Sequence, residues 1–132
     1  MDPRHKIRQK IVQQLYSETF IKQSLLDKKT TEVIKNFKVI NEHIRKYAPK
    51  FPIDKIAKVD LAILQLSIYE LIIEKKEPDK AIINEAVELA REMGSDKAYG
   101  FVNAVLGKIY EEEISNSKMT YKKSKNNNFF TF

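Results

Sequence analysis

The stretch Asp54–Leu71, DKIAKVDLAILQLSIYEL, decides the fold. Its apolar residues recur three or four positions apart, the spacing of one helix face, at Ile56, Val59, Ile63, Leu66 and Tyr69. Further apolar residues fill the other sides, and a helix that is apolar nearly all round is buried by its neighbours. The stretch is too short, and too often interrupted by polar residues, to span a bilayer. We therefore expect it to be the central helix of a helical domain.

The composition suits one globular, helix-rich domain. The chain has 132 residues, of which 42% are hydrophobic and 32% charged. It has no Cys, which excludes disulfides and thiolate chemistry and fits a reducing compartment such as the cytoplasm. No apolar run follows the basic N-terminal residues, so we expect no signal peptide. The net charge of +6 and the pI of about 9.4 favour a polyanionic partner, without distinguishing RNA, DNA and acidic lipid.

Two helices are expected before the central one. Asp2 followed by Pro3 is a good helix start, because the carboxylate can cap the first turn and Pro suits the first helical position. No Gly or Pro interrupts the chain after that, so we expect a helix over Pro3–Leu26. A second helix is expected over Thr31–Tyr47, and it should end at Ala48 because the residue before Pro49 disfavours the α conformation.

Two helices are expected after the central one. Asp79 should cap the first of them, and Gly94 should end it. Ser95 should cap the last helix, which ends near Glu113. No alternating stretch predicts a strand, so the predicted fold class is all-α. The domain should span residues 1–113, and the polar, basic, Asn-rich segment 114–132 should be a disordered tail.

Three segments resemble the motifs of the NusB family of bacterial transcription antitermination factors. They are DLAILQLSIYEL at Asp60–Leu71, INEAVELA at Ile83–Ala90 and FVNAVL at Phe101–Leu106, in the family's order and at its spacing. The family's basic N-terminal pattern is matched more loosely, by Arg4, Arg8, Gln13, Leu15 and Tyr16. The chain departs from the pattern at His5, Ile7, Ile11 and Gln65, and it is shorter than most members between Tyr16 and Phe37.

The resemblance implies an all-helical fold of two small three-helix subdomains, the first of them trimmed or rearranged here. It also implies binding to the boxA element of nascent single-stranded RNA together with the ribosomal protein NusE, in support of transcription of ribosomal RNA operons. The partners would be RNA, NusE and the transcription elongation complex, without a membrane and with homodimerisation left open. No catalytic activity and no cofactor are implied. The alternative is a helical protein–protein adaptor without specific RNA binding.

The first helix begins with five basic or titratable residues that are candidates for phosphate contacts: Arg4, His5, Lys6, Arg8 and Lys10. The alternative interpretation is a solvated helix flank. Cations near a helix N-terminus oppose the helix dipole, at a cost of about 0.3–1 kcal/mol in unfavourable cases. Their presence therefore needs another reason, and phosphate binding supplies one.

Aromatic residues are candidates for stacking on unpaired bases. Tyr99 and Phe101 are two residues apart, so they cannot share a helix face. The family motif favours Phe101 as the RNA-side residue, with Lys97 and Lys108 adding charge. The family's use of the central helix singles out Asp60 as a contact to NusE, with Tyr16 as an aromatic anchor beside it. The alternative is that Asp60 only caps or solvates its helix.

Other classes of function have little support. There is no Gly-rich phosphate loop, and the two His residues, His5 and His43, belong to different expected helices without further ligands at metal-binding spacing. We therefore predict no enzyme and no metal site. A DNA-binding helix-turn-helix over residues 89–106 fails because Gly100 and Asn103 occupy the positions where its second helix must pack on the first.

Overall fold

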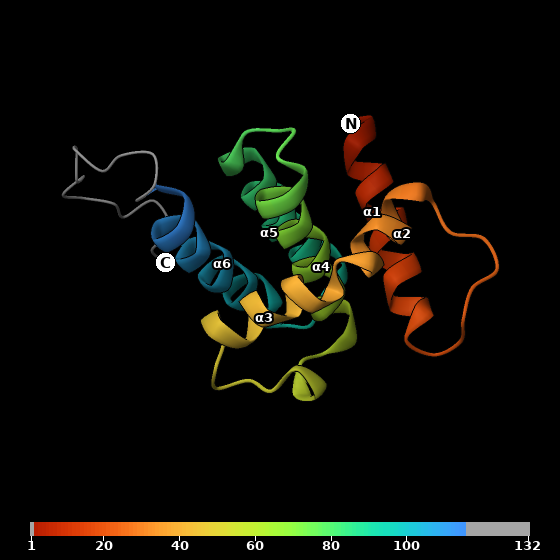
Figure 1. Ribbon diagram of the computed structural model, residues 1–132, viewed down its shortest axis with the longest axis horizontal. Helices are drawn as coiled ribbons and strands as arrows, with labels where there is room; N and C mark the ends of the chain where they lie inside the picture. Colours follow the sequence, from red (N-terminus) through yellow and green to blue (C-terminus); the bar gives the residue numbers. More distant parts are fainter. Residues whose placement is uncertain (1, 116–132) are drawn as a thin grey trace.

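The computed structural model describes residues 2–115, which fold into six α-helices with no strand among them (Figure 1). The all-α prediction is therefore confirmed. The helices are α1 (Pro3–Glu18), α2 (Lys28–Lys35), α3 (Phe37–Tyr47), α4 (Lys58–Ile68), α5 (Asp79–Met93) and α6 (Ala98–Ile109). A 3₁₀ turn, η1 (Ile53–Lys55), precedes α4, and π-helical turns follow α4 and α6 as η2 (Tyr69–Glu74) and η3 (Tyr110–Ser115). No helix in this part of the chain is both long and apolar enough to cross a membrane.

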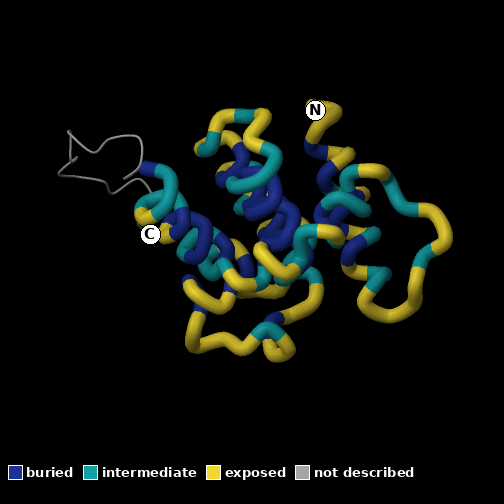
Figure 2. The backbone as a smooth tube through the Cα atoms, in the orientation of Figure 1, coloured by how far each residue is buried: buried dark blue, intermediate teal, exposed yellow. Residues whose placement is uncertain are grey.

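The predicted central helix is α4. Every residue from 62 to 71 is buried (Figure 2), and α4 contacts α1, α3, α5 and α6. It begins at Lys58 and not at Asp54, because Ile56 and Ala57 adopt extended backbone conformations after η1. At its other end η2 continues the helix to Glu74, and Lys75 closes it in the left-handed conformation with φ 53°.

The first helix is shorter than predicted, ending at Glu18 and not at Leu26. Asp2 caps it as expected, accepting a hydrogen bond from the Arg4 amide. Beyond Glu18 the chain folds back, since Gln14 Oε1 accepts hydrogen bonds from the Asp27 amide at 3.0 Å and the Thr30 hydroxyl at 2.6 Å. The apolar residues of the turn find no core to join: the exposed fractions are 61% at Phe20, 69% at Ile21 and 87% at Leu25.

The helix predicted over Thr31–Tyr47 is two helices, α2 and α3. They meet at Asn36, whose backbone leaves the α conformation at φ −105° and ψ 14°. The Asn36 side-chain amide donates to the Glu32 carbonyl at 2.8 Å. Such side-chain bonds compete with the helix ladder, which explains a break that apolar spacing alone does not show. α3 packs on α4 and α6, whereas α1 packs on α4 and α2.

The last two helices are confirmed, but their predicted caps are not. Pro78, and not Asp79, occupies the N-cap of α5, and Lys97, and not Ser95, that of α6. Gly94 ends α5 as predicted, in an extended conformation. Helical structure continues past the predicted domain end at residue 113, as far as Ser115. The rest of the predicted tail, residues 116–132, lies outside the described residues.

Candidate nucleic-acid interface

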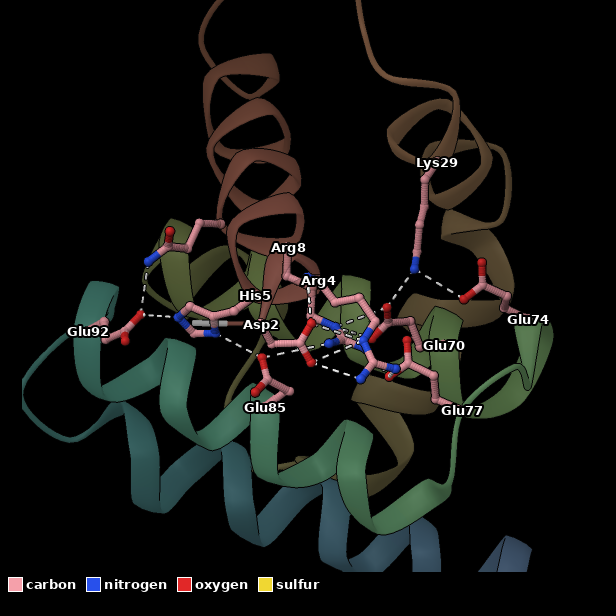
Figure 3. A network of polar contacts seen from close by, with 11 residues as sticks. Asp2, Arg4, His5, Arg8, Lys29, Glu70, Glu74, Glu77, Glu85 and Glu92 are labelled. Atoms are coloured by element: carbon pink, nitrogen blue, oxygen red, sulfur yellow. Dashed lines mark hydrogen bonds and ion pairs between the residues drawn. The ribbon is translucent and has the colours of Figure 1, made fainter.

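The inward face of α1 carries charge. Arg8 is 4% exposed, and its Nε lies 3.0 Å from Oε1 of Glu70, which is 2% exposed. Its Nη2 lies 2.9 Å from Glu77 Oε1 (Figure 3). Burial alone would lower the pKa of Arg8, but the charges of Glu70 and Glu77 offset burial and raise that pKa. Arg8 therefore joins α1 to the segments that follow α4.

His5 lies between two carboxylates of α5. Its Nδ1 is 2.8 Å from Glu85 Oε1 and its Nε2 is 2.8 Å from Glu92 Oε1. A neutral imidazole has one N–H donor, so both bonds are donated at once only by the protonated ring. The hydrogen bonds to Glu85 and then Glu92 raise the pKa of His5, although burial opposes them. Protonated His5 thus fastens the start of α1 to α5.

Lys29 of α2 completes this set of ion pairs. Its Nζ lies 2.6 Å from Glu70 Oε2 and 3.1 Å from Glu74 Oε1. Burial alone would lower the pKa of Lys29, but the two carboxylates raise it. We call this set the buried ion-pair network: His5, Arg8, Lys29, Glu70, Glu74, Glu77, Glu85 and Glu92.

The buried ion-pair network corrects the prediction for two residues. His5 and Arg8 are predicted phosphate contacts, yet both are nearly fully buried and bonded to carboxylates. The network holds more carboxylates than cations, so it does not attract a polyanion. The charges at the start of α1 therefore have a structural reason, which is to pair with glutamates of later helices.

The other three cations of α1 are exposed. Arg4 is paired with Asp2 at 2.8 Å, and its hydrogen bonds lower the pKa of Asp2 to about 2. Lys10 lies 3.4 Å from Asp27. Lys6 has no ion pair with any of residues 2–115. Lys6 is therefore available to a phosphate backbone, whereas Lys10 and Arg4, which also lies 3.6 Å from Glu77, would exchange surface ion pairs for phosphate contacts.

The structure brings the predicted residues Lys97 and Phe101 together beside the amino-terminal end of α4. They line a cavity of about 440 Å³ with Phe51 and Lys55. The rings of Phe51 and Phe101 meet edge to face, with centroids 5.0 Å apart. Tyr99 is 43% exposed, and the Arg91 guanidinium lies over its ring, 4.5 Å from the ring centre. We call the following set the aromatic–lysine surface: Phe51, Phe101, Lys50, Lys55, Lys97 and Lys108.

Tyr16 lies at the other side of the α4 amino terminus, at the end of α1. Its ring meets that of Phe20 edge to face at 5.0 Å, and the Lys58 ammonium lies 6.0 Å from the Phe20 ring centre. Lys58 directly follows Ala57, which lines the 440 Å³ cavity. Tyr16 is 38% exposed and so is free to contact a partner.

Asp60 is not a surface carboxylate. It is 5% exposed and accepts hydrogen bonds from the Ser95 amide at 3.1 Å and the Ser95 hydroxyl at 2.8 Å. It therefore holds the turn between α5 and α6 against α4, and this structural role replaces its predicted role as a partner contact. The same turn carries Lys97, so Asp60 helps to fix the position of this member of the aromatic–lysine surface.

Sequence reasoning missed Phe51 and Lys55, which lie in the connection before α4. A signal was present: Phe51 stands between Lys50 and Pro52, in a segment that no helix buries. An exposed aromatic residue next to a lysine in such a connection is a candidate for stacking on an unpaired base. Among residues 2–115 no three His, Asp or Glu side chains are grouped so as to hold a metal ion.

Comparison with known proteins settles the family. The model of the NusB family matches residues 4–111. The chain belongs to the NusB family. Two relatives named transcription antitermination protein NusB illustrate the range of similarity. The one from Clostridium tetani is 49% identical over 80 residues, covering 61% of this chain and 52% of that protein. The one from Dehalococcoides mccartyi is 32% identical over 126 residues, covering 80% of this chain and 88% of that protein.

Solved structures share the fold. NusB of T. maritima superposes with a TM-score of 0.74 at 27% identity, covering 90% of this chain and 98% of that one. A structure of NusB and NusE in complex with double-stranded RNA gives a TM-score of 0.68 at 22% identity, covering 82% and 96%. The matched region spans about half to two thirds of the first curated relatives, 52% in Clostridium tetani and 64% in Alkaliphilus oremlandii.

Proposed function

We propose that this chain is a transcription antitermination factor that binds boxA-type single-stranded RNA together with ribosomal protein NusE, in support of transcription of ribosomal RNA operons. It acts by binding and not by catalysis, needs no cofactor, and works in the cytoplasm within the transcription elongation complex. The observation that carries the proposal is the aromatic–lysine surface in a member of the NusB family. The fold neighbour solved with NusE and RNA supports testing both partners.

RNA recognition would use two exposed regions. Lys97 and Lys55 would neutralise phosphates beside Phe101, on whose ring an unpaired base would stack. Arg4, Lys6 and Lys10 would add phosphate contacts along α1, and each contact would release condensed counterions. The buried residues His5 and Arg8 take no part in this interface except by fixing α1 in place.

NusE would bind near Tyr16. Exposed aromatic residues often carry the energy of an interface, and Tyr16 presents its ring together with that of Phe20. Two basic proteins side by side would neutralise a longer run of phosphates, and joint binding would order the RNA once and not twice. Tyr16→Ala should then weaken NusE binding in calorimetric titration while leaving RNA binding by the isolated protein intact.

An electrophoretic mobility shift decides between this function and the alternative of a protein-binding adaptor. The alternative is favoured by the exposed apolar side chains Phe20, Ile21 and Leu25. The same sequence is tested as single-stranded RNA, single-stranded DNA and duplex RNA. We expect a shift with single-stranded RNA at lower protein concentration than with the other two. Binding of NusE without any shift of RNA would favour the adaptor and contradict the RNA-binding proposal.

A further inference from the structure

A second cavity shares the Phe51–Phe101 pair with the first. It measures about 220 Å³, and its lining includes Pro49, Lys50, Phe51, Phe101, Ala104 and Lys108. It is therefore formed by the connection after α3 and by the outer face of α6. Small-molecule pockets usually measure about 300–1,000 Å³, so this cavity suits one flat group and not a whole ligand.

The two aromatic rings form a wall that both cavities share. Phe51 and Phe101 line each of them, with an interplanar angle of 66°. In such an edge-to-face pair one ring keeps both of its faces unstacked, whereas a parallel stack would cover one face of each ring. The pair therefore presents aromatic surface to both cavities, with Phe101 half-buried against the core and Phe51 more exposed. Phe51 is 52% exposed, which keeps its ring accessible.

Each cavity has its own pair of lysines. Lys55 and Lys97 flank the first, and Lys50 and Lys108 flank the second. All four are exposed, and none forms an ion pair with any residue from 2 to 115. Tyr47 also lines the second cavity, and its hydroxyl donates a hydrogen bond to the Glu113 carboxylate. Glu113 is itself paired with His43. The rim of the cavity therefore attracts an anionic partner and repels a basic one.

Flat aromatic groups joined by phosphates at regular intervals are the chemistry of a single-stranded nucleic acid. We propose that the second cavity binds one further unpaired nucleotide of the RNA strand that occupies the first, with its base against the Phe51–Phe101 wall and its flanking phosphates on Lys50 and Lys108. The strand would thus cross the wall with one base on each side. This inference rests on the proposed RNA-binding function and extends the footprint beyond Lys97 and Phe101.

The salt dependence of binding tests the inference. Affinity is measured by fluorescence anisotropy with a labelled single-stranded RNA of roughly 12 nucleotides, within the site sizes of about 4–16 nucleotides that single-strand binders cover. For single strands each lost phosphate contact reduces the slope of log K against log salt by about 0.7. Lys50→Ala with Lys108→Ala should therefore reduce the slope by about 1.4. Ala104→Phe, which fills the cavity, should weaken binding by about 5- to 150-fold, the worth of one stacked base.

Two double variants serve as references. Lys76→Ala with Lys80→Ala removes the same charge from the connection after η2 and the first turn of α5, and should leave the slope within about 0.3 of the parent value. Lys55→Ala with Lys97→Ala removes the lysines of the first cavity. If the parent binds and only this last variant changes the slope, the second cavity holds no nucleotide and the inference is overturned while the proposed function stands. If the parent binds no RNA, the proposed function fails and the inference falls with it.

Discussion

Arg8 of α1 and Glu70 of η2 form an ion pair that is almost completely enclosed: Nε lies 3.0 Å from Oε1, and the exposed fractions are 4% and 2%. The two residues are separated by most of the N-terminal half of the chain, so the pair fixes how α1 sits on the central helix. Without Arg8, Glu70 keeps Lys29 as its partner at 2.6 Å, but the five glutamates of the buried ion-pair network then face only two cations, which is costly.

Arg8→Ala should therefore lower the free energy of unfolding by about 3 kcal/mol or more, as measured by chemical denaturation. Arg4→Ala is the matched control, because Arg4 has the same charge on the same helix but is exposed. A surface change of this kind should stay within about 0.5 kcal/mol of the parent. Equal effects of the two substitutions would show that Arg8 is not enclosed.

His5 should make stability depend on pH. Its pKa is raised above the ordinary value of 6.5 by the hydrogen bonds to Glu85 and Glu92, so the folded state binds the proton more tightly than the unfolded state. The stability that it contributes is then fully present below pH 6.5 and is lost as the pH rises through the raised pKa of the folded state. The stability difference between the parent and His5→Gln should therefore shrink between pH 6.5 and alkaline pH.

Denaturation curves at several pH values measure this difference. The measurements should run upward from pH 6.5, the ordinary pKa of a histidine, because the loss of the His5 contribution lies above that value. A difference that stays constant, or that grows as the pH rises, would contradict the role of protonated His5 as a link between α1 and α5.

Gly94 should tolerate no side chain. A Cβ at this position would lie 2.5 Å from the Ala98 Cβ and 2.8 Å from both the Ala90 carbonyl oxygen and Asp60 Oδ1. Two of these neighbours are rigid, so Gly94→Ala should destabilise the fold by about 1–3 kcal/mol through overpacking. It should also displace Asp60 from Ser95 and so weaken RNA binding at Lys97.

Gly100 is the control for that substitution. A Cβ there would meet nothing within 4 Å, and the residue lies in α6. Gly100→Ala should stabilise the protein by about 0.4–1 kcal/mol, because it restricts the unfolded chain at no steric cost. Thermal melts of the two variants should shift in opposite directions, and a shift in the same direction would contradict the packing described at Gly94.

The helices that apolar spacing marks strongly could be predicted from the sequence. Most of the α4 stretch is buried where the spacing places it, since packing of its apolar residues is what stabilises a helix in a protein. The break at Asn36 depends on a hydrogen bond that its side chain donates to the Glu32 carbonyl, and the early end of α1 on one that Gln14 Oε1 accepts from the Asp27 amide. Apolar spacing carries no information on such polar bonds, whether the partner is four residues away, as for Asn36, or thirteen, as for Gln14.

The site was predicted in part for the same reason. Phe101 follows from the family motif and Lys97 from its charge nearby; the structure places both on one cavity, and their binding role stays a prediction. His5, Arg8 and Asp60 look like surface charges in the sequence, because their partners Glu85, Glu70 and Ser95 lie 35 to 80 positions away. A local pattern does not reveal such partners. Phe51 was missed because its importance comes from the ring of Phe101, which lies on another element.

We propose that single-stranded RNA binds at Phe101 and Lys97. The affinity of this RNA for a variant with Phe101→Leu and Lys97→Ala is the decisive measurement. Leu keeps the apolar packing of Phe101 but removes its ring, so a melt that matches the parent shows that the fold is intact. Because the variant lacks the stacking ring, its affinity at fixed salt should fall by about 5- to 150-fold relative to the parent. A folded variant whose affinity stays within about twofold of the parent's would contradict RNA binding at Phe101 and Lys97 and place the RNA elsewhere on the protein.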